Sequence, residues 1–195
     1  MIGIGLTVIF GVMRIINMAH GELMMLGAFC GLGVMTFLEY PFWIAVLASI
    51  GAMALFGIIL ERAVIRPILG QPAFSIVMLT FGLGYVARGL VTMIPNIGTD
   101  THALAAPYKE VSYAWGGVVL GASQVVVVVC TTLLCLVLYL VFSRSKVGIA
   151  MQAASQNQLA AYYMGIPVKR LNSLVWALAA VVATIAGLLL APITF

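Results

Sequence analysis

The feature that most constrains this chain is a series of long apolar runs with almost no charged residues. Six such runs lie at 2–13, 23–38, 42–60, 73–94, 118–142 and 173–195, and only the fourth contains a charge, Arg88. A helix needs roughly 20 apolar residues to cross a bilayer, so the last four runs are long enough and the first two are short. We therefore predict an all-α polytopic transmembrane bundle of about six membrane segments, with a discontinuous or re-entrant region near residues 14–22.

The composition excludes several classes of protein. Of the 195 residues, 64% are apolar and 7% are charged, whereas a soluble domain carries roughly 25% charged residues and a wettable exterior. These values exclude a soluble enzyme, a disordered chain and a basic nucleic-acid binder, so the expected environment is a lipid bilayer. The two histidines lie far apart in the sequence and the three cysteines lie in apolar runs. We therefore expect neither a metal site nor a cofactor.

The distribution of basic residues predicts the orientation of the chain. The loops at 61–72 and 143–172 are basic, whereas the loop at 95–117 carries only Lys109. Lysine and arginine collect on the cytoplasmic side of membrane proteins, which places the first two loops inside. Seven basic residues then lie on that side: Arg14, Arg62, Arg66, Arg144, Lys146, Lys169 and Arg170. We expect Arg88, six residues before the end of its run, to reach the outer interface rather than to line a pathway.

Polar residues separate the first two apolar runs: Arg14, Asn17, His20 and Glu22. Ionisable groups within a bilayer are costly and mark pathways or paired sites, and short segments with polar groups between them are typical of discontinuous helices. In that interpretation Asn17 caps the following helix and Glu22 lies near its positive N-terminal end. The alternative is an ordinary cytoplasmic hairpin with capped ends.

The same stretch carries a family resemblance. The core Asn-x-Ala-His-Gly-Glu at 17–22, with its apolar flanks, resembles the signature of the branched-chain amino acid ABC transporter permeases. Urea and short-chain amide permeases share this signature. The resemblance places four residues on the substrate pathway: Asn17, His20, Gly21 and Glu22. The stretch 61–67 is similar to the family's first basic cytoplasmic loop, although anchoring at the cytoplasmic side accounts for its charges as well.

The loop at 143–172 is too long for a simple turn and is patterned for helix. We predict one short helix at 147–154 and a second at 158–164, with Asn157 as the N-cap and Gly165 at the C′ position. The second helix is suited either to docking a cytoplasmic partner or to lying on the lipid surface.

Here too the family favours one alternative. Leu159-Ala160-Ala161-x-x-x-Gly165 is similar to the Glu-Ala-Ala-x-x-x-Gly coupling motif by which ABC permeases contact their ATPases. The departure is Leu159 in place of glutamate, which removes the acidic contact. The resemblance implies an ATPase contact through Asn157, Leu159, Ala160, Ala161 and Gly165.

The function implied by the resemblance is that of a permease subunit of an ABC importer for branched-chain amino acids in the bacterial inner membrane. The chain carries no G-x-x-x-x-G-K-[S/T] phosphate loop, so cytoplasmic ATPase subunits would hydrolyse ATP and this chain would not be an enzyme. Further implied partners are a second permease subunit and a periplasmic substrate-binding protein, for which the turn-rich stretch 95–100 is a docking candidate. We expect a single transmembrane permease domain over 1–195, with 143–172 as its coupling loop, and a chain cut from a longer permease.

Three alternatives remain open. A urea or short-chain amide importer fits the same signature. An ion-coupled secondary transporter or channel would need buried acidic coupling residues, and only Glu22 lies near the membrane interior. A membrane enzyme is the weakest alternative, because no catalytic constellation is present.

Overall fold

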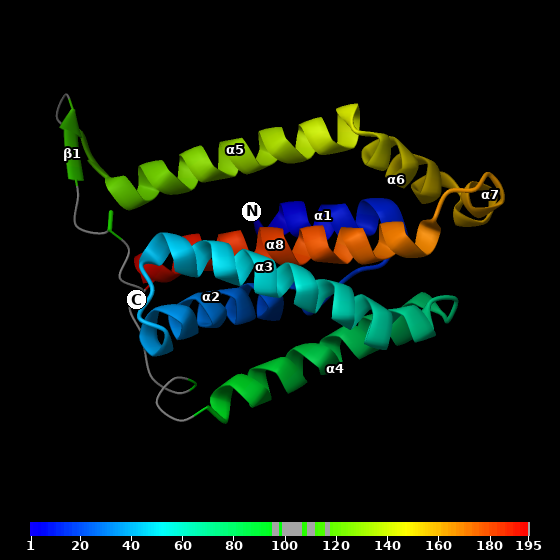
Figure 1. The fold of residues 1–195 in the computed structure, drawn as a ribbon, viewed down its shortest axis with the longest axis horizontal. Coiled ribbons are helices and arrows are strands. Elements are labelled where there is room, and N and C mark those ends of the chain that lie inside the picture. Colours follow the sequence, from blue (N-terminus) through cyan, green and yellow to red (C-terminus); the bar gives the residue numbers. More distant parts are fainter. Residues whose placement is uncertain (95–97, 99–106, 109–111, 116–117, 195) are drawn as a thin grey trace.

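The computed structural model describes residues 1–94, 98, 107–108, 112–115 and 118–194. The α-helices are α1 Ile2–Met13, α2 His20–Phe37, α3 Phe42–Leu60, α4 Ala73–Thr92, α5 Ala122–Arg144, α6 Lys146–Gln156, α7 Gln158–Tyr163 and α8 Val168–Thr194 (Figure 1). A π-helix, η1 Glu61–Ile65, and a 3-10 turn, η2 Arg66–Ile68, follow α3 directly. Strands β1 Ser112–Trp115 and β2 Val118–Gly121 form an antiparallel hairpin before α5.

The predicted all-α membrane bundle is confirmed. Five of the described helices are long and apolar enough to cross a membrane, and α1 is a shorter apolar helix, which agrees with about six segments. One boundary prediction is wrong: the fifth apolar run begins with residues 118–121 in strand β2, and helix α5 starts only at Ala122. The start of that run is rich in β-branched valine, which suits a strand as well as a helix.

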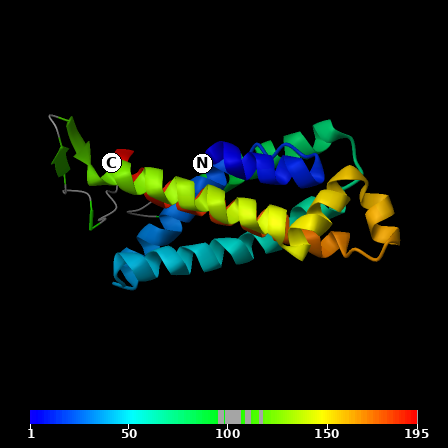
Figure 2. The ribbon, with the colours of Figure 1, turned by 90° about the horizontal axis from the view of Figure 1, so that it is seen from above.

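Helix α8 is the centre of the bundle and packs against α1, α2 and α3 (Figure 1). Seen from above, α5 passes in front of it (Figure 2). Close approach depends on small residues: Gly27 of α2 faces Thr184, and Gly57 of α3 faces the Trp176 carbonyl. A Cβ at either glycine would overlap α8, so these helices pack backbone to backbone, as small-residue interfaces in membranes do.

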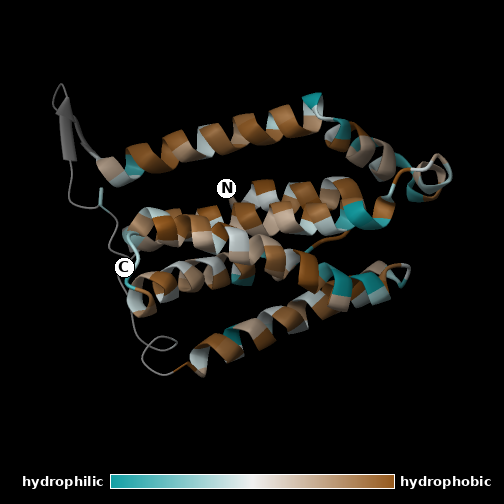
Figure 3. Cartoon of the chain, in the orientation of Figure 1, coloured by the Kyte–Doolittle hydropathy of each residue, from teal (hydrophilic) through white to brown (hydrophobic). Residues whose placement is uncertain are grey.

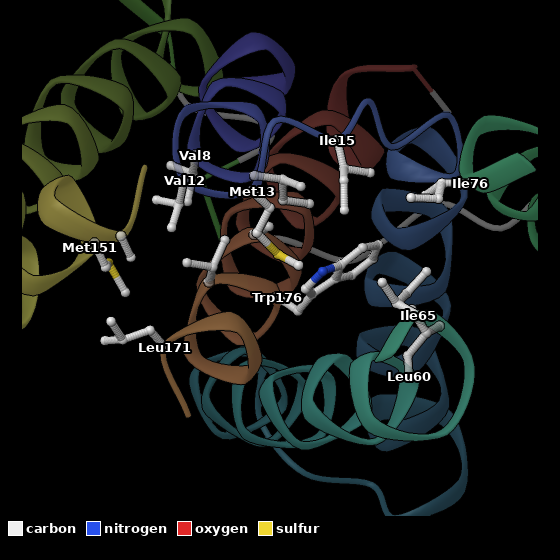
Figure 4. Packing of buried hydrophobic residues seen from close by; sticks show 14 of the residues in the cluster. Val8, Val12, Met13, Ile15, Leu60, Ile65, Ile76, Met151, Leu171 and Trp176 are labelled. Carbon is white, nitrogen blue, oxygen red and sulfur yellow. The ribbon is translucent and has the colours of Figure 1, made fainter. Parts of the chain in front are cut away.

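The main apolar core surrounds Trp176 of α8, which is fully buried. Around its ring lie Met13 at the end of α1 and Ile15 just after it (Figure 4). Leu60 at the end of α3 and Ile65 of η1 lie there too. The core therefore ties the end of α1, the end of α3 and the first half of α8 together at one end of the bundle.

Helices α4 and α5 are apolar along most of their length (Figure 3). Most of their apolar side chains are exposed at the surface of the chain. On α5, Val128, Val129, Leu133 and Leu136 are all more than half exposed. In a bilayer such a surface meets lipid or another membrane segment without cost.

The elements predicted to be cytoplasmic gather at one end of the bundle. The turn after α1, the η1–η2 segment and the pair α6–α7 share that end, and the hairpin and the α2–α3 turn lie at the other (Figure 1). This arrangement agrees with the prediction that the loops at 61–72 and 143–172 share a side. Lys109, His102 and, apart from Gly98, the docking stretch 95–100 lie outside the described residues.

Candidate functional site

The chain turns back on itself between α1 and α2. Arg14 has left-handed backbone angles, φ 58° and ψ 27°, and its N–H donates to the Phe10 carbonyl at 3.0 Å, which ends α1. The next residues are not helical, and their side chains alternate: Ile15, Asn17 and Ala19 are buried, whereas the two between them are exposed. An alternation of two is the pattern of extended chain.

Helix α2 begins well inside the bundle. The His20 imidazole lies directly against Gly5 of α1, where a Cβ would overlap the ring. Gly5 precedes the last residue of α1, Met13, by eight residues, or about 12 Å of helix. Extended chain covers about 3.3 Å per residue, so residues 15–17 together with the turn at 18–19 return by roughly that length. The predicted discontinuous region near 14–22 is therefore confirmed, and the simple hairpin is not what forms.

Buried polar atoms without partners line this break. Asn17 is fully buried, and its Oδ1 accepts a hydrogen bond from the Ala19 N–H at 3.1 Å. Its Nδ2 and both ring nitrogens of the buried His20 have no hydrogen-bond partner among the described residues. The predicted cap is wrong, because Ala19 is the N-cap residue of α2 and Asn17 supports it from two residues earlier. Gly21 is exposed on the first turn of α2.

A distant threonine fixes the break to α4. The hydroxyl of Thr80 accepts from the Met18 N–H at 3.2 Å and donates to the Val77 carbonyl at 2.9 Å. Thr80 is fully buried. Sequence reasoning missed it, since one threonine in an apolar run gives no signal beyond its hydroxyl.

Glu22 and Arg88 form an ion pair between α2 and α4. Glu22 Oε1 accepts from Arg88 Nη2 at 2.6 Å, and the two side chains are 19% and 62% exposed. The sequence predicted that Arg88 reaches the outer interface; in the structure α4 carries it beside the first turn of α2, where it pairs with Glu22. A cavity of about 190 Å³ adjoins the pair and is lined by Met18, Glu22, Phe81, Gly84, Tyr85 and Arg88.

The helix pair α6–α7 is a second candidate site. Both ends of α7 are capped as predicted. Asn157 Oδ1 accepts from the N–H groups of Leu159 and Ala160, both at 3.0 Å. At the other end, Gly165 has φ +82° and its N–H donates to the Tyr162 carbonyl at 3.0 Å. The Ile166 N–H reaches the Ala161 carbonyl at 3.0 Å, which completes a Schellman motif.

The surface of α7 is apolar and aromatic. Ala161 is buried against the rest of the chain, whereas Ala160 is exposed and Leu159, Tyr163 and Met164 are 65%, 77% and 82% exposed. Flexible methionine and amphipathic tyrosine are typical of protein interfaces. This short helix therefore projects a contact surface from the end of the bundle (Figure 1).

A buried carboxylate joins α3 to the start of α8. Glu61 is fully buried and pairs through both oxygens with Arg66, at 3.1 Å to Nε and 2.7 Å to Nη2. Ser173 donates to Glu61 Oε2 at 2.6 Å, and Arg66 also donates to the Lys169 carbonyl at 3.1 Å. Sequence reasoning assigned these charges to anchoring and missed the junction, although Glu61 one turn before Arg66 was the available signal.

Metal-binding residues do not cluster in the part of the chain that the structure describes: no group of three or more His, Cys, Asp or Glu side chains comes together there. Near the start of α2, the groups available to a ligand are the unpartnered polar atoms of the break and the Glu22–Arg88 pair.

Comparison with known proteins gives a consistent result. The family model described as "Branched-chain amino acid transport system / permease component" matches residues 1–195. Similar relatives are the high-affinity branched-chain amino acid transport system permease proteins BraD of Pseudomonas aeruginosa, 27% identical, and LivH of Escherichia coli K12, 26% identical. Each match covers 97% of this chain and 65% of the relative. The chain thus spans somewhat less than two thirds of these relatives, and no solved structure matches it.

Proposed function

The chain belongs to the family of branched-chain amino acid permease components, and from that premise we propose that it is a permease subunit of an ABC importer for branched-chain amino acids. In this proposal it forms one transmembrane domain in the cell membrane, the inner membrane of a bacterium. It has no ATPase site of its own. Its partners are cytoplasmic ATPase subunits, a second permease subunit and a substrate-binding protein outside.

The observation that carries the proposal is the direct connection from α7 to the central helix. Only residues 164–167 separate α7 from α8, and they are held by the Schellman motif and by the Val168 N–H to the Ile166 carbonyl at 2.8 Å. Helix α8 in turn packs against α1, α2 and α3. A displacement of α7 by an ATPase would therefore reach the break by shear of packed helices rather than be lost in a flexible linker.

The break between α1 and α2 supplies the substrate pathway in this proposal. We assign Asn17, His20, Gly21 and Glu22 to the substrate pathway, on the support of the unpartnered polar atoms that Asn17 and His20 hold inside the bundle. Discontinuous helices of this kind present polar groups to a solute at membrane depth. Rocking of α8 against α2 would open and close access to them.

Direct contact with the ATPase is assigned to Asn157, Leu159, Ala160, Ala161 and Gly165. The capping geometry gives these residues two tasks: Asn157, Ala161 and Gly165 shape α7, whereas Leu159 and Ala160 lie on its exposed side. Leucine at 159 makes an apolar contact where a glutamate would make a charged one. A crosslinker placed at Leu159 or Met164 should capture the ATPase, and one at Leu133 on the exposed face of α5 should not.

The substrate is tested by uptake. In membrane vesicles that carry the intact transporter, we expect ATP-dependent accumulation of leucine, isoleucine and valine and none of urea. Accumulation of urea in place of leucine would contradict the substrate class. Leucine uptake driven by an ion gradient without ATP would contradict the ABC mechanism.

A further inference from the structure

The cavity beside Glu22 and Arg88 combines two opposite charges with an apolar wall. Met18, Phe81 and Tyr85 supply the apolar side, and the carboxylate and guanidinium supply the polar side. Its volume of about 190 Å³ suits a small solute, since an engineered protein cavity of about 150 Å³ holds benzene. The lining is therefore complementary to a small molecule that carries one positive group, one negative group and an apolar body.

We propose that this cavity binds a zwitterionic amino acid, with Arg88 receiving the α-carboxylate and Glu22 the α-ammonium group. The apolar side chain of the guest lies against Met18 and Phe81. This inference rests on the proposed function and deepens it, because it names the residues that recognise the common part of the substrates.

Charge balance in a low-dielectric environment favours a zwitterion over other guests. Without a guest, Glu22 and Arg88 neutralise one another at 2.6 Å. A zwitterion that enters between them replaces one ion pair by two, so the site has no net charge in either state. A cation or an anion would leave an uncompensated charge, which is costly away from water. A neutral solute such as urea would separate Glu22 from Arg88 without supplying an opposite charge to either side chain.

Packing around the pair leaves room for this exchange. A Cβ at Gly84 would lie 3.5 Å from Glu22 Cγ, so the glycine keeps the space beside the carboxylate free. Phe81 and Arg88 are about half exposed or more, so the cavity opens on the face of α4 rather than being enclosed. Thr80 holds Met18 in place beside this opening.

The test compares leucine with two analogues that each lack one charge, leucinamide and 4-methylpentanoate. They compete for leucine uptake by the intact transporter reconstituted in proteoliposomes. We expect Arg88→Gln to weaken leucine recognition roughly 10- to 100-fold, as loss of a charged hydrogen bond does, and to abolish the preference for leucine over leucinamide. Glu22→Gln should instead abolish the preference for leucine over 4-methylpentanoate. Arg62→Gln and Glu39→Gln, at exposed positions, should change neither preference.

Two further variants separate recognition from a purely structural ion pair. Gly84→Val fills the cavity without touching a charge and should lower leucine affinity, whereas Gly82→Val on the open side of α4 should not. The double variant Glu22→Arg with Arg88→Glu retains an ion pair, but the positive and negative groups exchange places relative to the apolar wall of the cavity. Wild-type leucine uptake by the double exchange, or unchanged preferences in both single variants, would overturn the proposed site.

Failure of the site and failure of the function give different results. If the unmodified transporter accumulates leucine but the charge variants keep both preferences, only the zwitterion site is wrong. If the unmodified transporter accumulates no amino acid, the proposed function itself is wrong.

Discussion

The break between α1 and α2 and the pair α6–α7 both interrupt the run of membrane helices, but different contacts hold them. In α6–α7 each cap is local: Asn157 binds N–H groups two and three residues away, and Ile166 reaches back to Ala161. The break depends on distant partners, since Met18 binds a threonine 62 residues away and Glu22 an arginine 66 residues away. The helix pair is thus encoded by its own segment, and the break is shaped by the bundle around it.

The Glu61 junction lies beside the second of these regions, because it ties the start of α8, just after α7, to the end of α3. Glu61→Ala should have the largest effect on stability. It leaves the Arg66 guanidinium without its carboxylate and removes the nearer of the two acceptors of Ser173. We expect a loss of about 2–3 kcal/mol in the free energy of unfolding, less than for a fully buried pair because Arg66 is 33% exposed. Thermal unfolding in detergent measures this loss.

Arg62→Gln is the matched control for that experiment. Arg62 is exposed on the same segment and forms no ion pair within the described part of the chain, so its loss should leave the melting temperature unchanged. Equal melting temperatures for Glu61→Ala and Arg62→Gln would show that the junction does not stabilise the packing of α8 on α3.

Overpacking at Gly5 tests the distant contacts of the break. Gly5→Ala places a methyl group where the buried His20 ring lies, so α2 must move away from α1. We expect a destabilisation of about 1–3 kcal/mol, as for other overpacked interiors, together with a loss of leucine uptake. Gly11→Ala on the same helix meets open space and should be neutral. Equal behaviour of the two variants would place the start of α2 elsewhere than beside Gly5.

Backbone strain introduced at Gly165 tests the pair α6–α7, whose caps are local. Gly165→Ala forces a side chain onto a backbone with φ +82°, at a cost of about 1–2 kcal/mol. Because the contacts of α7 are local, the bundle should stay assembled while ATP hydrolysis proceeds without uptake. Gly70→Ala carries similar strain, with φ +102°, in the turn after η2 and should keep the two processes coupled. Normal uptake by Gly165→Ala would contradict the role of α7.

The same contrast explains what could be predicted from the sequence. The caps of α7 followed from residue type and spacing, because Asn157 and Gly165 act within one turn of their own positions. The short apolar runs on either side of a polar stretch were enough to predict the break itself. They did not predict its partners, because nothing in an apolar run tells which helix Thr80 or Arg88 will face. Arg88 was assigned to the outer interface for that reason, since distance to the end of its run was the only local information.

Two asparagines allow the comparison to be tested with one substitution. Each accepts a backbone N–H through Oδ1, but Asn157 is exposed and Asn17 is buried with an unpartnered Nδ2. Serine keeps an acceptor and removes the amide donor. Asn157→Ser should therefore behave as wild type, whereas Asn157→Ala should lose about 1 kcal/mol of α7 stability and part of the coupling.

At position 17 the expected result of the same change is different. Asn17→Ser retains an acceptor for Ala19 but removes Nδ2, the atom that our proposal offers to the substrate or to water on its pathway. Uptake should fall while the melting temperature changes by less than it does for Gly5→Ala. If Asn17→Ser transports leucine normally, Asn17 acts as Asn157 does, only as a side-chain acceptor for backbone N–H groups. The buried amide would then belong to the architecture of the break and not to the pathway.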